Sequence, residues 1–234
     1  MKNFIIIFFI LLIGYKKPNS KVIITTTQTY GLYGKVELVS EKTINANFNE
    51  NWNITVDTIN PYCFIENRFF DKKGVITFID YYSKDSLFIT KSIYDSSNKN
   101  ESQISSQTDK FGKIIEYTKF ISINDSLVHS ETFDSYTNDT ISKTSTKIVN
   151  GKIIWSKTEN IKGGKSSEWY YKRDTNGLEI EMKTIFSYDK DKYYQKIKIK
   201  YIEFDKKGNW TKRIQYNEKE KYCTLQTRLF KYYD

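Results

Sequence analysis

One turn signature recurs along this chain of 234 residues: an aspartate, two further residues, a glycine, and then a run that contains β-branched or aromatic residues. It occurs at residues 70–76, 108–114, 173–178 and 204–210, and a shortened version occurs at 149–153. Glycine supplies the positive φ that a hairpin connection needs, and aspartate hydrogen-bonds the backbone at the start of the turn. The sequence therefore predicts an all-β fold, an antiparallel meander of β-hairpin repeats that forms a curved or open sheet.

The composition and the spacing of glycines favour the same fold. The chain has one alanine, Ala46, but 19 Tyr, 15 Phe and 4 Trp, an alphabet that suits pleated strands better than helices. An A+T-rich genome would enrich several of the same residues, so composition alone does not establish the fold. Glycines 34, 74, 112, 151, 177 and 208 are 40, 38, 39, 26 and 31 residues apart, a spacing typical of repeats. We expect a single domain over residues 21–234.

Residues 1–20 have the features of an export leader. A short basic start, Met1-Lys2-Asn3, precedes an unbroken apolar run of ten residues at 4–13. Ten helical residues span about 15 Å, half of a bilayer core, which is typical of the apolar region of a signal peptide. A buried N-terminal strand is the alternative. The leader predicts an exported protein of the periplasm, the outer membrane or the cell surface.

The end of this leader, Leu11-Leu12-Ile13-Gly14-Tyr15-Lys16-Lys17, resembles the lipobox of bacterial lipoproteins, particularly those of Bacteroidota. In that motif a small residue precedes the cysteine that is lipidated, and Tyr15 occupies the cysteine position here. The resemblance implies export. Because tyrosine offers no thiol, it gives no support for a lipid anchor.

Two turn copies carry a further resemblance. Phe70-Asp71-Lys72-Lys73-Gly74, with Arg68 upstream, and Phe204-Asp205-Lys206-Lys207-Gly208, with Tyr201 upstream, resemble the YD (RHS-type) repeats of bacterial surface and toxin-delivery proteins. They are also similar to a group of exported Bacteroidota proteins of unknown function. The resemblance implies a hairpin-repeat fold in the cell envelope. Generic hairpin chemistry is the alternative explanation, because such a turn evolves easily.

The two cysteines, Cys63 and Cys223, test whether the sheet closes. In an open meander of about ten strands they would lie roughly 35 Å apart, whereas a disulfide needs Cα atoms within about 7 Å. We expect two separate packed thiols.

The residues that usually carry catalysis or bind metals are scarce. His129 is the only histidine and is expected to be structural. Gly163-Gly164-Lys165-Ser166 is predicted to be a loop tip, because Glu159 stands where a phosphate-binding loop has its first glycine. Two cysteines and one histidine cannot form a usual zinc site. We therefore predict no catalytic, cofactor-binding or metal-binding residue.

One pair of carboxylates offers an alternative. Glu179 and Glu181 are expected on one face of a strand, roughly 7 Å apart, a separation within the range of glycoside hydrolases. Alternation with Ile180 and Met182 favours a solvated face.

Charge is concentrated near the C-terminus. Residues 192–234 carry 12 Lys and Arg against 5 Asp and Glu, a net charge of +7 out of +9 for the chain. Alternation places the lysines of residues 196–200 opposite Ile197, Ile199 and Tyr201, and places Trp210, Ile214 and Tyr216 on one face of the next strand. The predicted polyanion-binding residues are Lys196, Lys198, Lys200, Lys212 and Arg213.

These observations favour an exported, non-enzymatic binding or interaction protein of the cell envelope. Its expected partner is an anionic glycan, a lipid headgroup or an acidic protein, and export argues against nucleic acid. A charged surface that only maintains solubility is the simpler explanation of the lysines. The alternative functions are an envelope glycan hydrolase that uses Glu179 and Glu181, or an accessory or immunity protein of a YD-type toxin system.

Overall fold

The computed structural model describes residues 27, 30–48, 54–58, 62–83, 87–95, 102–124, 126–188, 191–217 and 222–234. The predicted leader and Tyr15 lie outside these residues. These residues contain fifteen β-strands: β1 (Val36–Phe48), β2 (Ile54–Val56), β3 (Cys63–Phe70), β4 (Ile76–Ser83), β5 (Phe88–Asp95), β6 (Ser102–Thr108), β7 (Ile114–Asn124), β8 (Leu127–Asp134), β9 (Thr140–Val149), β10 (Lys152–Asn160), β11 (Lys165–Arg173), β12 (Glu179–Tyr188), β13 (Asp191–Phe204), β14 (Trp210–Asn217) and β15 (Tyr222–Tyr232). No helix among the described residues is long and apolar enough to cross a membrane.

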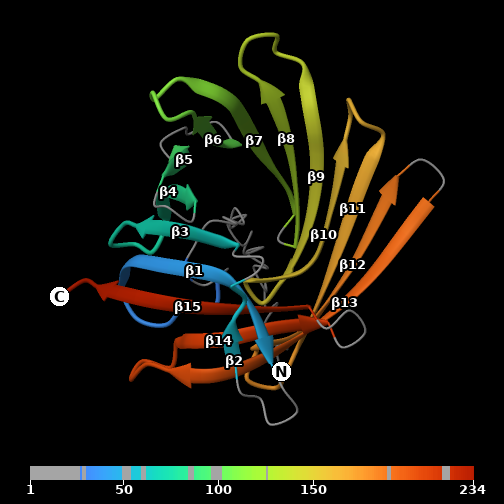
Figure 1. Cartoon of the computed structure of the whole chain (residues 1–234). Helices are drawn as coiled ribbons and strands as arrows, with labels where there is room; N and C mark the ends of the chain where they lie inside the picture. Colours follow the sequence, from blue (N-terminus) through green and yellow to red (C-terminus); the bar gives the residue numbers. More distant parts are fainter. Residues whose placement is uncertain are drawn as a thin grey trace, which may run out of the picture.

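The strands form one antiparallel meander that closes into a barrel (Figure 1). From β3 to β15 each strand pairs with the next, and β1 pairs with both β3 and β15. The closing pair runs from Val36 opposite Tyr232 to Ala46 opposite Cys223. Fourteen strands complete the ring, and the short β2 pairs only with the end of β1.

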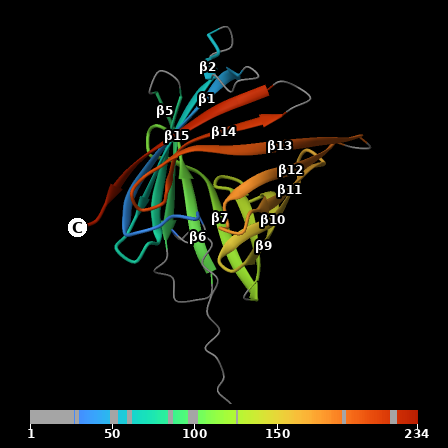
Figure 2. The same ribbon diagram turned by 90° about the horizontal axis from the view of Figure 1, so that it is seen from below.

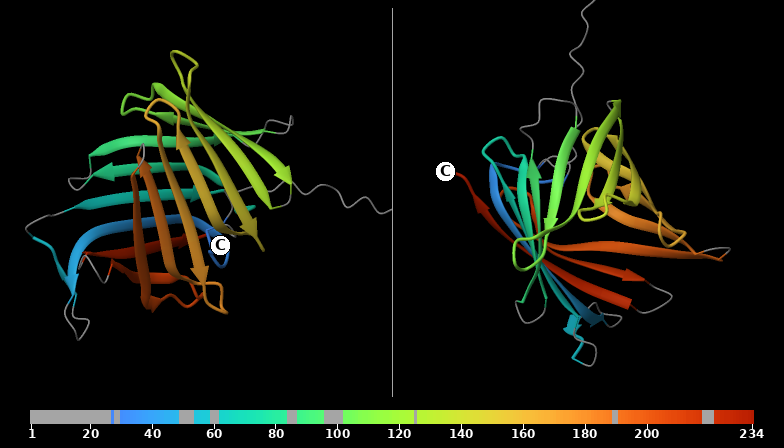
Figure 3. Two further views of the ribbon diagram at one scale, coloured as in Figure 1. Left: turned by 90° about the vertical axis from the view of Figure 1, so that its right-hand side faces the viewer. Right: turned by 90° about the horizontal axis from the view of Figure 1, so that it is seen from above.

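The prediction of an antiparallel hairpin meander is confirmed, but the prediction of a curved or open sheet is wrong. Closure removes the two exposed edges that an open sheet would leave unpaired, which is the most complete way to protect a sheet. Figures 2 and 3 show the same strands from below, from one side and from above.

All four full copies of the turn signature are hairpin tips with one hydrogen-bonding pattern. In each tip the glycine N–H donates to the aspartate carbonyl, and the aspartate N–H donates to the carbonyl four residues ahead. One aspartate oxygen accepts from the N–H groups two and four residues ahead, as Asp71 does from Lys73 and Val75 at 2.8 and 2.9 Å. Asp109, Asp174 and Asp205 accept the same two hydrogen bonds.

Three of these tips lie at the same end of the barrel. Because the strands run alternately up and down, the tips at residues 71–74, 174–177 and 205–208 share one end, and the tip at 109–112 is at the other. Residues 27 and 30–35, which precede β1 and which we call the crossing segment, lie across the first end. Thr27 donates its N–H to the Gly74 carbonyl at 2.8 Å, and the Tyr33 N–H donates to Asn209 Oδ1 at 2.7 Å.

The main apolar cluster lies where the crossing segment meets the paired strands β15, β1 and β3, which we call the seam. Leu32 and Val39 pack with Phe70, Ile76 and Ile79 from β3 and β4, and the rings of Tyr30, Tyr81, Tyr94 and Phe230 surround them. Residues from both ends of the chain therefore build one core at the β15–β1–β3 seam.

The two faces of the wall alternate along each strand, as β13 illustrates. Ile197 and Ile199 are buried on the inner face, while Lys196 and Lys200 are exposed on the outer face, as predicted. The alternation fails at bulges. The β13–β14 register shifts between the pairs Glu203–Lys212 and Phe204–Trp210, which turns the Trp210 side chain toward the inner arginines. The predicted common face of Trp210 with Ile214 and Tyr216 is therefore wrong.

Closure does not join the cysteines. Both thiols are free, with Cys223 buried, in agreement with the prediction of separate thiols. Cys63 lies opposite Ile44 and Cys223 lies opposite Ala46, so strand β1 separates them. Two strand spacings amount to about 10 Å, beyond the reach of a disulfide.

Candidate functional site

A cavity of about 190 Å³ opens at the barrel end that the crossing segment spans. Its walls come from that segment, from the first residues of β10, from the tip that precedes β12, and from the inner faces of β11, β12, β13, β14 and β15. The charged side chains of the wall are Lys152, Arg173, Glu179, Arg213 and Arg228, and the aromatic ones are Tyr30, Tyr33, Tyr171, Tyr201 and Trp210.

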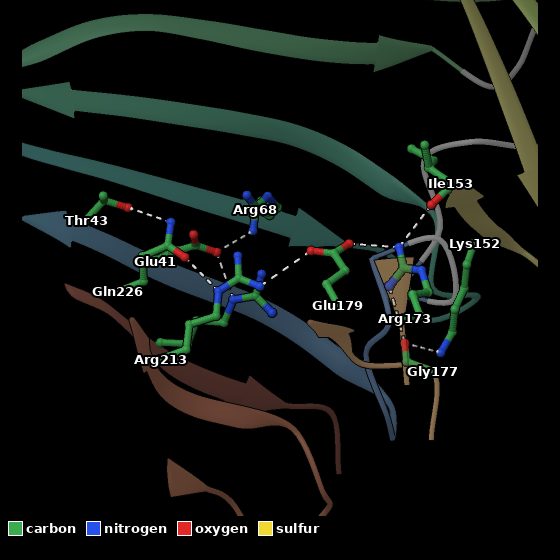
Figure 4. Close-up of polar contacts among 11 residues, drawn as sticks. Glu41, Thr43, Arg68, Lys152, Ile153, Arg173, Gly177, Glu179, Arg213 and Gln226 are labelled. Atoms are coloured by element: carbon green, nitrogen blue, oxygen red, sulfur yellow. Dashed lines mark hydrogen bonds and ion pairs between the residues drawn. The ribbon is translucent and has the colours of Figure 1, made fainter. Parts of the chain in front are cut away.

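Arg173 fixes one side of the cavity (Figure 4). Its guanidinium donates to the Gly177 carbonyl at 3.2 Å, to the Ile153 carbonyl at 3.1 Å and to Glu179 Oε1 at 2.8 Å. Lys152 Nζ donates to the same Gly177 carbonyl at 2.9 Å. The glycine that permits the hairpin turn thus also offers the carbonyl that orients two cations.

Arg213 continues the network across the inner wall. Arg213 Nη1 on β14 lies 3.6 Å from Glu179 Oε2 on β12, and this ion pair spans the intervening strand β13. Arg213 Nε donates to Gln226 Oε1 at 2.6 Å, and the Gln226 amide donates to Thr43 Oγ1 at 3.3 Å. Five strands, β11, β12, β14, β15 and β1, are linked by this chain of contacts.

Arg228 and Arg68 share one carboxylate at the seam. Glu41 Oε2 accepts from Arg228 Nε at 2.8 Å and from Arg68 Nη1 at 3.1 Å. Burial by itself would raise the pKa of Glu41, but the charges of Arg228, Arg68 and Arg213 outweigh it and hold that pKa well below its usual range. Burial, together with repulsion from Arg68 and Arg213, lowers the pKa of Arg228 to about 10.

The neighbourhood of the cavity has more positive than negative charge. Lys152, Arg68, Arg173, Arg213 and Arg228 face the carboxylates of Glu41, Glu66 and Glu179, an excess of two positive charges in this group. The Arg228 guanidinium also lies over the Trp210 ring, 3.7 Å from its centre, and Arg213 lies 4.1 Å from that centre. Ring stacking and shared carboxylates stabilise arginines that no single ion pair neutralises.

Two guanidinium nitrogens in the cavity wall have hydrogen-bonding capacity left. Arg228 Nη1 and Arg173 Nε are buried, and neither has a hydrogen-bond partner among the described residues. Arg228 as a whole is only 7% exposed. A buried donor without a partner costs free energy, more so when it is charged.

Glu179 and Glu181 do not converge, which contradicts the geometry needed for the hydrolase alternative. The β11–β12 register shifts between Lys172 and Arg173, so Glu179 faces the inner arginines. Glu181 faces outward and pairs with Lys196 at 2.8 Å. The expected common face is lost because a bulge inserts one residue between two otherwise alternating positions.

The predicted polyanion-binding residues are divided between the two faces. Lys196, Lys198 and Lys200 share the outer face of β13, and Lys212 lies on the outer face of β14, where it pairs with Glu203 at 3.3 Å. Arg213 lies opposite Tyr201 on the inner face and is 8% exposed, so its assignment to this surface is wrong.

The other residues considered in the sequence are distant from these features. His129 on β8 contacts Ser145 through Nδ1 at 2.7 Å, a cross-strand hydrogen bond. Residues 163–166 belong to the hairpin between β10 and β11. Within the described part of the chain, no three His, Cys, Asp or Glu side chains are grouped so that they could hold a metal ion.

The sequence analysis missed the inner arginine cluster. Its members stand at residues 68, 173, 213 and 228, where nothing in their spacing indicates contact. One local signal was available: Arg68 and Arg173 each precede a turn aspartate by one to three residues, which places their side chains near a barrel end.

No family model and no curated protein sequence matches the chain. Among solved structures, a porin-like protein from Bacteroides uniformis matches over 84% of this chain and 98% of its own, with 8% identity and a TM-score of 0.44. The barrel is established by its own hydrogen-bonded strand pairs, independently of this similarity.

Proposed function

We propose that this protein is an exported, non-enzymatic binding protein of the cell envelope, and that the outer lysines of β13 contact its partner. The observation that carries the proposal is the surface formed by Lys192, Lys196, Lys198, Lys200 and Lys212, which we call the outer lysine row. Lys196 pairs with Glu181 at 2.8 Å and Lys212 pairs with Glu203 at 3.3 Å, and the row gathers five ammonium groups on two adjacent strands. Such a surface attracts anionic glycans, anionic lipid headgroups and acidic proteins.

The same lysines favour a barrel wall in contact with water rather than lipid. Residues 192–200 of β13 extend over about 27 Å, the height of the apolar band that a membrane-spanning barrel presents to lipid. Four of the five outward positions in this stretch are lysines. A lysine at the bilayer midplane costs about 2–4 kcal/mol, so this strand is unsuited to face hydrocarbon.

The outer wall elsewhere has the same character. Ion pairs join Lys143 to Glu131 between β9 and β8 at 3.0 Å, and Lys157 to Glu159 on β10 at 2.7 Å. We therefore propose a water-exposed barrel that binds envelope components through its surface charge. The predicted export leader of residues 1–20 supports this location. An accessory role beside a YD-type toxin stays a prediction.

The binding test compares two triple variants that remove equal charge. Lys196→Gln, Lys198→Gln and Lys200→Gln removes most of the outer lysine row. The matched control replaces Lys119, Lys143 and Lys147, three exposed lysines on the outer wall of β7 and β9, by glutamine. Retention on a heparin column and sedimentation with anionic vesicles should fall in the first variant only. Equal retention of both variants would show that the row has no specific role.

Location is tested separately in the natural host or a related bacterium. After fractionation, we expect the protein in the envelope fraction and its release by high salt without detergent, because salt screens surface charge. Extraction that requires detergent would contradict a water-exposed barrel. Retention of the protein in the cytoplasm would contradict export.

A further inference from the structure

We propose that the cavity at the barrel end binds a small ligand through a carboxylate or phosphate group, with Arg228 as the residue that anchors it. This site is separate from the outer lysine row. It lies on the opposite face of the wall, and three of its four cations are arginines. The inference does not rest on the proposed surface function, because each site can fail in its test without the other.

The first argument is the unsatisfied donor. Arg228 lines the cavity, 93% of its side chain is buried, and its Nη1 has no hydrogen-bond partner among the described residues. Its Nε is already committed to Glu41. An oxyanion is the acceptor that best suits a guanidinium with a free N–H, because charge-assisted hydrogen bonds are roughly twice as strong as neutral ones.

The second argument is the charge balance. The arginines share their carboxylates: Glu41 serves Arg68 and Arg228, and Glu179 serves Arg173 and Arg213. With Lys152 and Glu66 included, the cluster keeps an excess of two positive charges in a largely buried setting. A ligand that carries one or two negative charges would balance this excess where water screens it poorly.

The third argument concerns size and access. Drug-sized pockets measure about 300–1,000 Å³, so a cavity of about 190 Å³ accommodates a smaller molecule, such as a monosaccharide that carries an acidic group. Aromatic side chains form much of the remaining wall. Tyr33 belongs to that wall and is 45% exposed, so the cavity reaches the protein surface beside it.

The test uses three probes that differ in one group: glucuronate carries a carboxylate, glucose 6-phosphate carries a phosphate, and glucose is neutral. Isothermal titration of the full chain, at constant ionic strength, should show binding of one or both acids and none of glucose. The acid that binds more tightly identifies the anionic group. If neither acid binds at about 10 mM, where a Kd near 1 mM is detectable, the proposal is overturned.

Variants then assign the site. Arg228→Met should weaken the binding about tenfold or more, since it removes a charged donor. Lys152→Met should weaken it by a smaller factor, because Lys152 lines the cavity without an unsatisfied nitrogen. Lys143→Gln, the matched control, removes a charge from the outer wall of β9, away from the outer lysine row, and should leave the affinity unchanged.

A second variant covers the case in which Arg228→Met does not fold, because that change leaves Glu41 without one of its partners. The double variant Glu41→Gln with Arg228→Met removes both members of the ion pair and avoids an uncompensated buried charge. Wild-type affinity in both this variant and Lys152→Met would overturn the assignment. Loss of acid binding only in the triple variant of the outer lysine row would place the site there instead.

Discussion

The inner and outer faces of the barrel wall carry the same sign of charge in two different chemical forms. At the inner face near the seam, arginines are buried, share carboxylates and lie over the Trp210 ring. On the outer faces of β12 and β13, Lys183 and Lys196 are exposed and pair with Glu181 on the same or the neighbouring strand. The comparison indicates that burial, rather than charge itself, selects the residue type.

The guanidinium group of arginine and the ammonium group of lysine differ in how strongly they are hydrated, which explains this selection. Guanidinium is planar, weakly hydrated and able to donate in several directions, so it tolerates burial when several acceptors surround it. Ammonium is strongly hydrated and is best kept in water, with only its hydrocarbon stem against the wall. The inner cations should therefore matter for stability and the outer ones should not, a contrast that single substitutions can break or sharpen.

The largest expected effect is at Glu41. Glu41→Gln leaves Arg68 and Arg228 without their shared carboxylate and should lower the free energy of unfolding by about 3–5 kcal/mol. Glu181→Gln, which breaks the outer pair with Lys196, should lower it by less than about 1 kcal/mol. Urea denaturation at neutral pH measures both. Similar losses at the two sites would remove the distinction between inner and outer pairs.

The effect of Glu41 should depend on pH. Its pKa is lowered in the folded protein, so the stability it contributes is fully present above the usual pKa of 4.5 and is lost as the pH falls toward the folded value. The difference in unfolding free energy between the wild type and Glu41→Gln should therefore shrink as the pH falls below about 4.5. A difference that stays constant between about pH 7 and pH 3 would contradict this linkage.

The stability that Glu66 contributes should depend on pH with the opposite sign. Burial raises its pKa above the usual value, so folding disfavours its charged form and stability is lost as the pH rises through the folded pKa. Glu66→Gln at neutral pH should consequently cost less than Glu41→Gln, although both carboxylates contact Arg68. The same urea series compares them.

A smaller effect is expected at two glycines in equivalent turns. Gly177 and Gly112 have φ values of 78° and 80°, so alanine at either position should cost about 1–2 kcal/mol through backbone strain. At Gly177 a Cβ would collide with Lys152 Nζ, whereas at Gly112 it would meet nothing within 4 Å. Gly177→Ala should therefore cost about 1 kcal/mol more, the value of the displaced hydrogen bond. Equal shifts in thermal unfolding would show that Lys152 contributes nothing there.

The smallest effect is expected for the outer lysine row. Replacing Lys196, Lys198 and Lys200 by glutamine should change the free energy of unfolding by no more than about 0.5 kcal/mol per site, because Ile197 and Ile199 keep the buried face intact. The same urea measurement applies. A loss near that of Glu41→Gln would show that the outer lysines stabilise the barrel.

The hairpins could be predicted from the sequence because their determinants are local. The aspartate and glycine of each tip lie three residues apart, and the hydrogen bonds that they make stay within the turn. Alternation likewise placed Ile197 and Ile199 inside and Lys196 and Lys200 outside. These features depend on residues that are close in the chain, so no knowledge of the whole barrel is needed.

Closure and the inner cluster were decided by the tertiary structure. The β1–β15 pairing joins Val39 to Phe230, residues 191 positions apart, and strand patterns do not specify such distant partners. Bulges then moved Glu179 and Trp210 relative to simple alternation, because one inserted residue reverses every later side chain on a strand. The sequence by itself determined which segments are strands and where they turn. Only the closed barrel determined which charges meet, because those contacts depend on the register and curvature of the complete sheet.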